Sequence, residues 1–113
     1  MEPGRFRHRI TIQNFRTEEM PSGQEKEVWF DVATNIPAEV KGISGRELMA
    51  SGAEMAEASI RIWLRYRTDI SSASRILWSP KGQPQMAYGL AAPPIANDKF
   101  TRLELLCKGG VKP

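Results

Sequence analysis

Several short segments of this chain alternate apolar and polar side chains, the period of a β-strand with one buried face. The strongest example is Ile60–Arg67. Its apolar face is made of Ile60, Ile62, Leu64 and Tyr66. Its other face is mostly basic and is made of Arg61, Trp63, Arg65 and Arg67. A register slip of one residue would bury three arginines, so we expect the apolar face to meet the core.

Further segments have the length and composition of strands and are separated by turn-forming residues. They are Phe6–Gln13, Val28–Val32, Ile36–Lys41, Arg75–Trp78, Gln85–Leu90 and Phe100–Cys107. Proline cannot donate to a sheet ladder, so Pro37 predicts an edge position or a kink. Residues 14–27 are polar and contain the turn signal Pro21-Ser22-Gly23, which predicts a long, mobile hairpin loop. We expect a second loop at residues 91–98 and a frayed tail at residues 109–113.

One segment predicts a helix. Ser44-Gly45-Arg46-Glu47 has the spacing of a capping box, in which Ser44 and Glu47 satisfy each other's backbone N–H groups. A short helix over residues 45–58 is therefore expected, interrupted at Gly52. Together, the segments predict a mainly β fold: a small antiparallel β-barrel or sandwich of about six or seven strands with one short helical insertion.

Length and composition indicate one ordinary globular domain. The chain has 113 residues, of which 41% are hydrophobic and 26% charged. We expect a single domain over residues 1–113, with no membrane span because no apolar stretch approaches about 20 residues. No apolar segment follows Met1–Arg5, so no secretory signal is expected. The single cysteine, Cys107, fits a reducing compartment.

The net charge is +3, and its distribution says more than its size. Basic residues gather in two strands: Arg5, Arg7 and Arg9 in the first, and Arg61, Arg65 and Arg67 in a later one. Acidic residues gather between them: Glu18, Glu19, Glu25, Glu27 and Asp31. This separation suits head-to-tail contacts between copies, a basic rim facing an anionic partner, or an unevenly charged solvated surface.

The sequence offers little for catalysis. The only histidine, His8, shares the apolar parity of its strand and is expected to be structural, and no G-x-S-x-G nucleophile motif occurs. Cys107 has apolar neighbours and is expected in the core. One cysteine and one histidine cannot supply the four N/S ligands of a usual zinc site within one copy. We therefore expect no enzyme activity, no cofactor and no metal.

Binding is better supported. Trp63 shares its strand face with three arginines, a composition typical of protein–protein hot spots and also of surfaces that stack on bases. The third interpretation is that another part of the same chain covers Trp63. The predicted partner-binding residues are Arg61, Trp63, Arg65, Arg67, Arg5, Arg7, Arg9, Glu18, Glu19, Glu25 and Glu27.

Taken in order, these segments resemble the phage head–tail joining proteins, also called head closure proteins or head–tail adaptors. The matching pieces span nearly the whole chain. They are Gly4–Gln13, the Gly23 loop leading into Trp29, Pro37–Val40, Gly45-Arg46-Glu47, Ile60-Arg61-Ile62 to Arg65-Tyr66-Arg67, and Leu103–Cys107. Each piece is a weak signal, and their order and spacing carry the resemblance.

The resemblance implies a small β-barrel whose copies form a ring beneath the portal of a tailed-phage capsid, twelve-fold like the portal. The ring would close the DNA-filled head and provide the docking surface for the tail. The implied partners are a portal or adaptor protein, tail-completion proteins and further copies of the chain, with packaged DNA passing through the ring. The implied location is the head–tail junction of the virion, and the host cytoplasm before assembly. The residues alone also allow a small basic β-barrel that binds nucleic acid through the strand face with Trp63.

Overall fold

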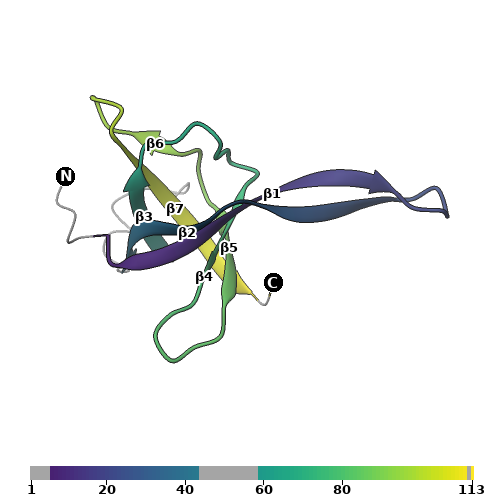
Figure 1. Ribbon diagram of the computed structural model, residues 1–113, viewed down its shortest axis with the longest axis horizontal. Coiled ribbons are helices and arrows are strands. Elements are labelled where there is room, and N and C mark those ends of the chain that lie inside the picture. Colours follow the sequence, from purple (N-terminus) through teal and green to yellow (C-terminus); the bar gives the residue numbers. More distant parts are fainter. Residues whose placement is uncertain (1–5, 44–58, 112) are drawn as a thin grey trace.

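The computed structural model describes residues 6–43, 59–111 and 113, which form seven antiparallel strands in one sheet (Figure 1). The strands are β1 His8–Glu19, β2 Glu25–Gly42, β3 Ile60–Arg65, β4 Arg75–Trp78, β5 Met86–Leu90, β6 Ile95–Ala96 and β7 Arg102–Val111. Their order is β3-β2-β1-β4-β5-β7-β6, and β3 also pairs with β7. This last pairing closes the sheet into a barrel, with β6 attached to β7. The predicted mainly β fold is confirmed as a barrel, and the predicted helix at residues 45–58 lies outside the described residues.

The core is the interior of this barrel, filled by the apolar positions of the alternating strands. Its largest fully buried side chains are Ile10, Ile12, Ile62, Leu64, Ile76, Leu105 and Cys107. The predicted inward face of β3 is therefore confirmed at Ile62 and Leu64, and Cys107 lies in the core as expected. Burial raises the pKa of the Cys107 thiol to about 12, as expected of a small core side chain with little thiolate character.

Tyr66 is an exception to the predicted inward face of β3. The strand ends at Arg65, whose partner Arg102 is the first residue of β7, so no sheet continues beyond that pair. The Tyr66 side chain is 40% exposed, and its ring packs edge-on against Phe100 with centroids 5.7 Å apart. The expectation that Tyr66 lies in the core is wrong because the ladder stops one residue before it.

Residues 14–27, predicted as a loop, are mostly strand. β1 and β2 remain paired from Asn14–Phe30 out to Glu19–Glu25 and form a two-stranded ribbon that extends away from the barrel (Figure 1). We call residues 14–30 the arm. A short turn ends it, in which the Met20 N–H donates to the Gln24 carbonyl at 2.7 Å. The arm buries neither face fully, so it lacks the apolar alternation by which strands are recognised.

The β2 strand bends where the arm leaves the barrel. The pairing shifts between Ile10 and Gln13 of β1, so β2 carries extra residues opposite this stretch, and Asn35 adopts a φ of 54°. Residues 33–35, which separate the predicted strands Val28–Val32 and Ile36–Lys41, form such an irregularity within one continuous strand. Pro37 pairs with β1, whereas pairing with β3 starts at Ala38, so Pro37 occupies an edge position.

Two segments near the end of the chain are more ordered than predicted. The expected loop at residues 91–98 contains β6, which pairs with the Leu103–Glu104 stretch of β7. The expected frayed tail begins inside β7, where Gly109 pairs with Tyr88. Both Gly109 and Gly110 have positive φ values, 96° and 106°, which glycine alone adopts easily.

Replacing Gly110 with alanine is expected to destabilise the protein by about 1–3 kcal/mol. The φ of 106° disfavours any side chain, and an added Cβ would lie 3.1 Å from Cε1 of Tyr88. Gly89→Ala is the matched control, since its Cβ would meet nothing within 4 Å and its φ is not positive. Chemical denaturation measures both, and equal stability of the two variants would contradict the prediction.

Candidate subunit interface

The outer face of β3 and β7 carries Arg61 and Arg65, two of the predicted basic residues, together with Trp63. Pairing places Arg61 opposite Leu106, Trp63 opposite Glu104, and Arg65 opposite Arg102. We call the surface of Arg61, Trp63, Arg65 and Arg102 the basic face. The Arg61 guanidinium forms an ion pair with Glu104 at 3.1 Å and lies 5.6 Å from the centroid of the Trp63 ring. Arg65 is exposed, and its partner in the ladder is Arg102. The two residues at this end of the ladder are therefore both positively charged.

Arg102 is a contributor that sequence reasoning missed. Its position is held by a hydrogen-bonded turn, because the Asn97 Oδ1 accepts from the backbone N–H groups of Thr101 at 2.8 Å and Arg102 at 3.0 Å. The alternation of β7 places Arg102 on its outward face, but only the register of β3 against β7 shows that it lies opposite Arg65. That register cannot be read from either strand alone.

A small pocket adjoins the basic face. It has a volume of about 110 Å³ and is lined by Trp63, Ile95, Ala96, Asn97, Arg102 and Glu104. Trp63 is half-buried, so the chain covers part of it, yet Ile95 beside it is 46% exposed. The pocket therefore combines an aromatic wall with an accessible aliphatic side chain, beneath a basic rim.

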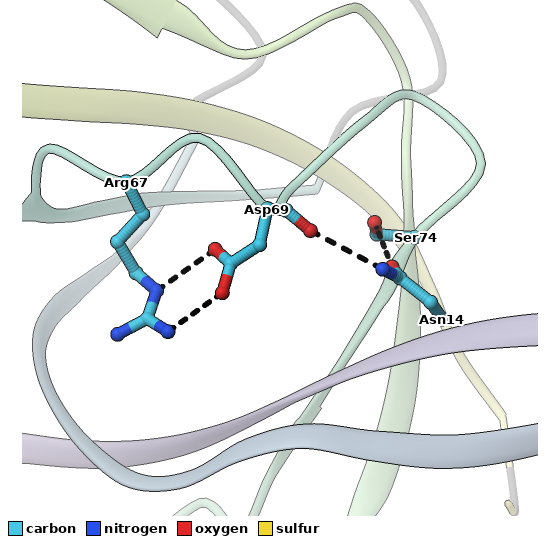
Figure 2. A network of polar contacts seen from close by, with 4 residues as sticks. All are labelled: Asn14, Arg67, Asp69 and Ser74. Atoms are coloured by element: carbon cyan, nitrogen blue, oxygen red, sulfur yellow. Dashed lines mark hydrogen bonds and ion pairs between the residues drawn. The ribbon is translucent and has the colours of Figure 1, made fainter.

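Arg67 lies beyond the end of β3 and faces its own chain. Its guanidinium donates to both carboxylate oxygens of Asp69, from Nε at 2.9 Å and Nη2 at 2.7 Å (Figure 2). The Asp69 carbonyl accepts from Asn14 Nδ2 at 3.2 Å, and the hydroxyl of Ser74 donates to Asn14 Oδ1. This network attaches the first residue of the arm to the loop that follows β3. The structure thus gives Arg67 an anchoring contact within the chain.

Replacing Asp69 with asparagine keeps its carbonyl and removes the ion pair. The hydrogen bond from Arg67 lowers the pKa of Asp69 in the folded protein. A carboxylate whose pKa falls on folding stabilises the fold at pH values above its pKa in the unfolded chain, which is about 4 for aspartate. We expect the variant to lose about 0.5–1 kcal/mol at pH 7, a modest effect because both groups are partly solvated. The difference from wild type should shrink as the pH falls below the unfolded pKa and should vanish once the carboxylate of the folded protein is protonated. Denaturation at several pH values measures this, and an equal loss in the exposed control Asp98→Asn would contradict it.

Aromatic and polar contacts stiffen the base of the arm. The rings of Phe15 and Trp29 pack with centroids 5.2 Å apart, and the Arg75 guanidinium lies 4.3 Å from the Trp29 centroid. Arg75 Nε also donates to Gln13 Oε1 at 2.6 Å, and Gln13 Nε2 donates to Asp31 at 2.7 Å. The arm thus leaves the barrel from a braced base.

The four glutamates predicted to bind a partner, Glu18, Glu19, Glu25 and Glu27, lie in the outer half of the arm, and all are exposed. Glu18 forms an ion pair with Arg16 at 3.0 Å and lies opposite Lys26. On the other face Glu19 lies directly opposite Glu25, and Glu27 shares that face by the period of the strand. One face of the arm therefore carries charges of both signs, and the other is acidic.

Of the basic residues of the N-terminal strand, Arg7 lies near the basic face, because it lines a pocket with Glu39 and Lys41, the partners of Trp63 and Arg61 in the β2–β3 ladder. Arg7 precedes β1 and is exposed, and Arg9 donates from Nη1 to the Phe6 carbonyl at 3.2 Å. Arg5 lies outside the described residues. His8 accepts a hydrogen bond at Nδ1 from the Val40 N–H at 3.3 Å and packs edge-on against Trp78, so contacts within the fold hold its ring.

Among the described residues, no group of three or more His, Cys, Asp or Glu side chains is placed to hold a metal ion. The same part of the chain contains no helix long and apolar enough to cross a membrane.

Comparisons with known proteins give the family of this chain. Residues 1–109 match the model of the phage head completion protein family. The chain is 50% identical over 115 residues to head completion protein gp7 of Enterobacteria phage HK97, covering 99% of each protein. The solution structure of protein SF1141 from Shigella flexneri 2a superposes with a TM-score of 0.82 and 38% identity, covering 100% of both chains. With this sequence match extending over almost its whole length, the chain belongs to the phage head completion protein family.

Proposed function

We propose that this chain is a structural part of the head–tail connector. In this proposal its copies assemble as a ring beneath the portal, close the DNA-filled head and present the surface on which the tail docks. The partners are a portal or adaptor protein, tail-completion proteins and neighbouring copies, with DNA passing through the ring. The protein acts by assembly and catalyses no reaction.

The full-length match to a head completion protein carries this proposal. The shape and charge of the molecule support it. A ring needs two different, complementary surfaces on each subunit, because each copy must present one to the neighbour on either side. The acidic arm and the basic face of β3 and β7 are two such surfaces.

The alternative function, nucleic-acid binding through the strand face that carries Trp63, is not favoured by the contacts of that face. Two of its arginines have carboxylate partners in the same chain, Arg61 with Glu104 and Arg67 with Asp69. Each such pair reduces the positive charge available to phosphates, which supply most of the affinity of nonspecific nucleic-acid binders.

Deletion of the gene from its phage or prophage tests the proposal. We expect the lysate to contain heads that have lost their DNA, together with separate tails, because nothing closes the filled head and tails have no surface on which to dock. Supplying the protein from a plasmid should restore joined particles and infectious titre, whereas an empty plasmid should not. Normal titre in the deletion strain would overturn the proposal.

A further inference from the structure

We propose that the tip of the arm of one copy docks on the basic face of the next copy, with Glu19 and Glu25 meeting Arg65 and Arg102. This inference rests on the proposed ring and names the contact between its subunits. It follows from two cross-strand pairs of like charge, one at each end of the molecule. We call Glu19 and Glu25 the acidic pair and Arg65 and Arg102 the basic pair.

The acidic pair is unfavourable in a free subunit. Its two residues lie directly opposite each other where β1 ends and β2 begins, and like charges so placed destabilise a ribbon. Over residues 6–43 and 59–111, neither carboxylate has an ion-pair partner. Glu27 adds a third negative charge to the same face, so the arm ends in a concentrated, uncompensated acidic surface.

The basic pair has the same defect with the opposite sign. Arg65 and Arg102 lie directly opposite each other where β3 ends and β7 begins. The ion pairs in the described parts of the chain use Arg61 and Glu104 on this face and leave both members of the basic pair without a carboxylate. The turn around Asn97 fixes the backbone of Arg102, so this charge is presented from a defined position.

Apolar groups accompany both pairs. Met20 follows Glu19 at the turn of the arm and is 40% exposed. The pocket of about 110 Å³ beside Trp63 borders the basic pair, since Arg102 lines it. A flexible methionine side chain suits an irregular small pocket, so Met20 is the group that we place there. The contact thus has an apolar centre and a charged rim, the usual anatomy of a protein interface.

The position of the two surfaces decides that the occupant is a second copy. Figure 1 shows the tip of the arm at one end of the long axis, with β3 and β6 toward the opposite end. The axis is 48 Å long, so the arm of a subunit projects away from its own basic face. Two unlike surfaces at opposite ends give a head-to-tail contact, which closes into a ring when the rotation between subunits divides a full turn.

Charge reversal and its rescue test the contact. Purified tailless heads are mixed with wild-type protein, with Glu19→Lys/Glu25→Lys, with Arg65→Glu/Arg102→Glu, or with the protein carrying all four substitutions. We expect each double reversal to reduce the number of heads bearing a ring about tenfold or more, and the fourfold variant to recover it. Lys81→Glu, an exposed reversal on the turn between β4 and β5, is the control and should assemble normally.

A cysteine pair reports the contact directly. Met20→Cys protein is mixed with Ile95→Cys protein on the same heads under mild oxidation, and a disulfide dimer is expected. Cys107 should not interfere because it is buried and has a raised pKa. Replacing Ile95→Cys by Gln83→Cys, on a distant exposed turn, should abolish the dimer.

Each outcome separates this inference from the proposed function. If wild type forms rings and both double reversals form them equally well, the arm contact is wrong and the connector function stands. If the double reversals fail and the fourfold variant also fails while it melts like wild type, the pairing of these charges is wrong. If wild type forms no ring on the heads, the proposed function fails and the inference falls with it.

Discussion

Replacing Ile62 with alanine is expected to destabilise the barrel by about 2–5 kcal/mol. Ile62 is fully buried in β3, which pairs with β2 on one side and with β7 on the other. Alanine removes three carbon atoms from a closed interior that the rigid sheet cannot collapse to fill, so a cavity remains. Equilibrium denaturation in urea measures the loss as a lower midpoint with an unchanged slope.

Ile95→Ala is the matched control for this substitution. The same atoms are removed from a side chain that is 46% exposed on the two-residue strand β6. We expect its stability to change by less than about 0.5 kcal/mol. A similar loss in the two variants would show that the closed β3–β7 ladder does not enclose the core.

Shortening the arm is expected to abolish head–tail joining while leaving the barrel folded. Residues 17–27 are replaced by Asn-Gly, so that Arg16 and Val28, which already lie opposite each other, are joined by a two-residue turn. All of the removed side chains are exposed, and the contacts that brace the base lie closer to the barrel. We therefore expect the melting temperature to change by no more than about 4–8 °C, the equivalent of about 1 kcal/mol.

The functional effect should be much larger. Without the tip a subunit loses the surface that we assign to its neighbour, and plasmid complementation of the deletion strain should fail to raise the titre above that of the empty plasmid. Thr17→Ala keeps the arm at full length and should complement normally. Full complementation by the shortened protein would show that the arm has no part in assembly.

Local patterns in the sequence predict the barrel strands well because each barrel strand has a buried face. The alternation in Ile60–Arg67 correctly places Ile62 and Leu64 inside and Trp63 outside, and β4 has the predicted bounds Arg75–Trp78. The prediction for Tyr66 is wrong because the end of the ladder depends on where β7, a strand distant in the sequence, begins. The period of a strand shows which residues share a face, but not where its partner stops.

The strands of the arm could not be predicted from the sequence. Its polar composition predicts a loop, and turn residues do occur at its tip, where Gly23 adopts a φ of 86°. Its strands are held by backbone hydrogen bonds between the two halves of the hairpin. Because the side chains are exposed on both faces, they show no alternation of apolar and polar residues. A hairpin outside the core is therefore read as a loop.

The candidate interface, like the fold, could be predicted from the sequence only in part. The sequence separates acidic from basic segments and thereby identifies Glu19, Glu25 and Arg65 as binding candidates. It does not show that Glu19 faces Glu25 or that Arg65 faces Arg102, because these are statements about register. It also leaves Arg67 among the partner-binding candidates, although its nearest carboxylate is Asp69, two residues away.

Electron cryo-microscopy of the portal vertex tests the central claim most directly. Heads from the deletion strain are imaged before and after the purified protein is added. The account predicts a closed ring of additional density beneath the portal, into which copies of the barrel fit with each arm reaching an adjacent copy. A bare portal on heads that nevertheless join tails after the protein is added would contradict it.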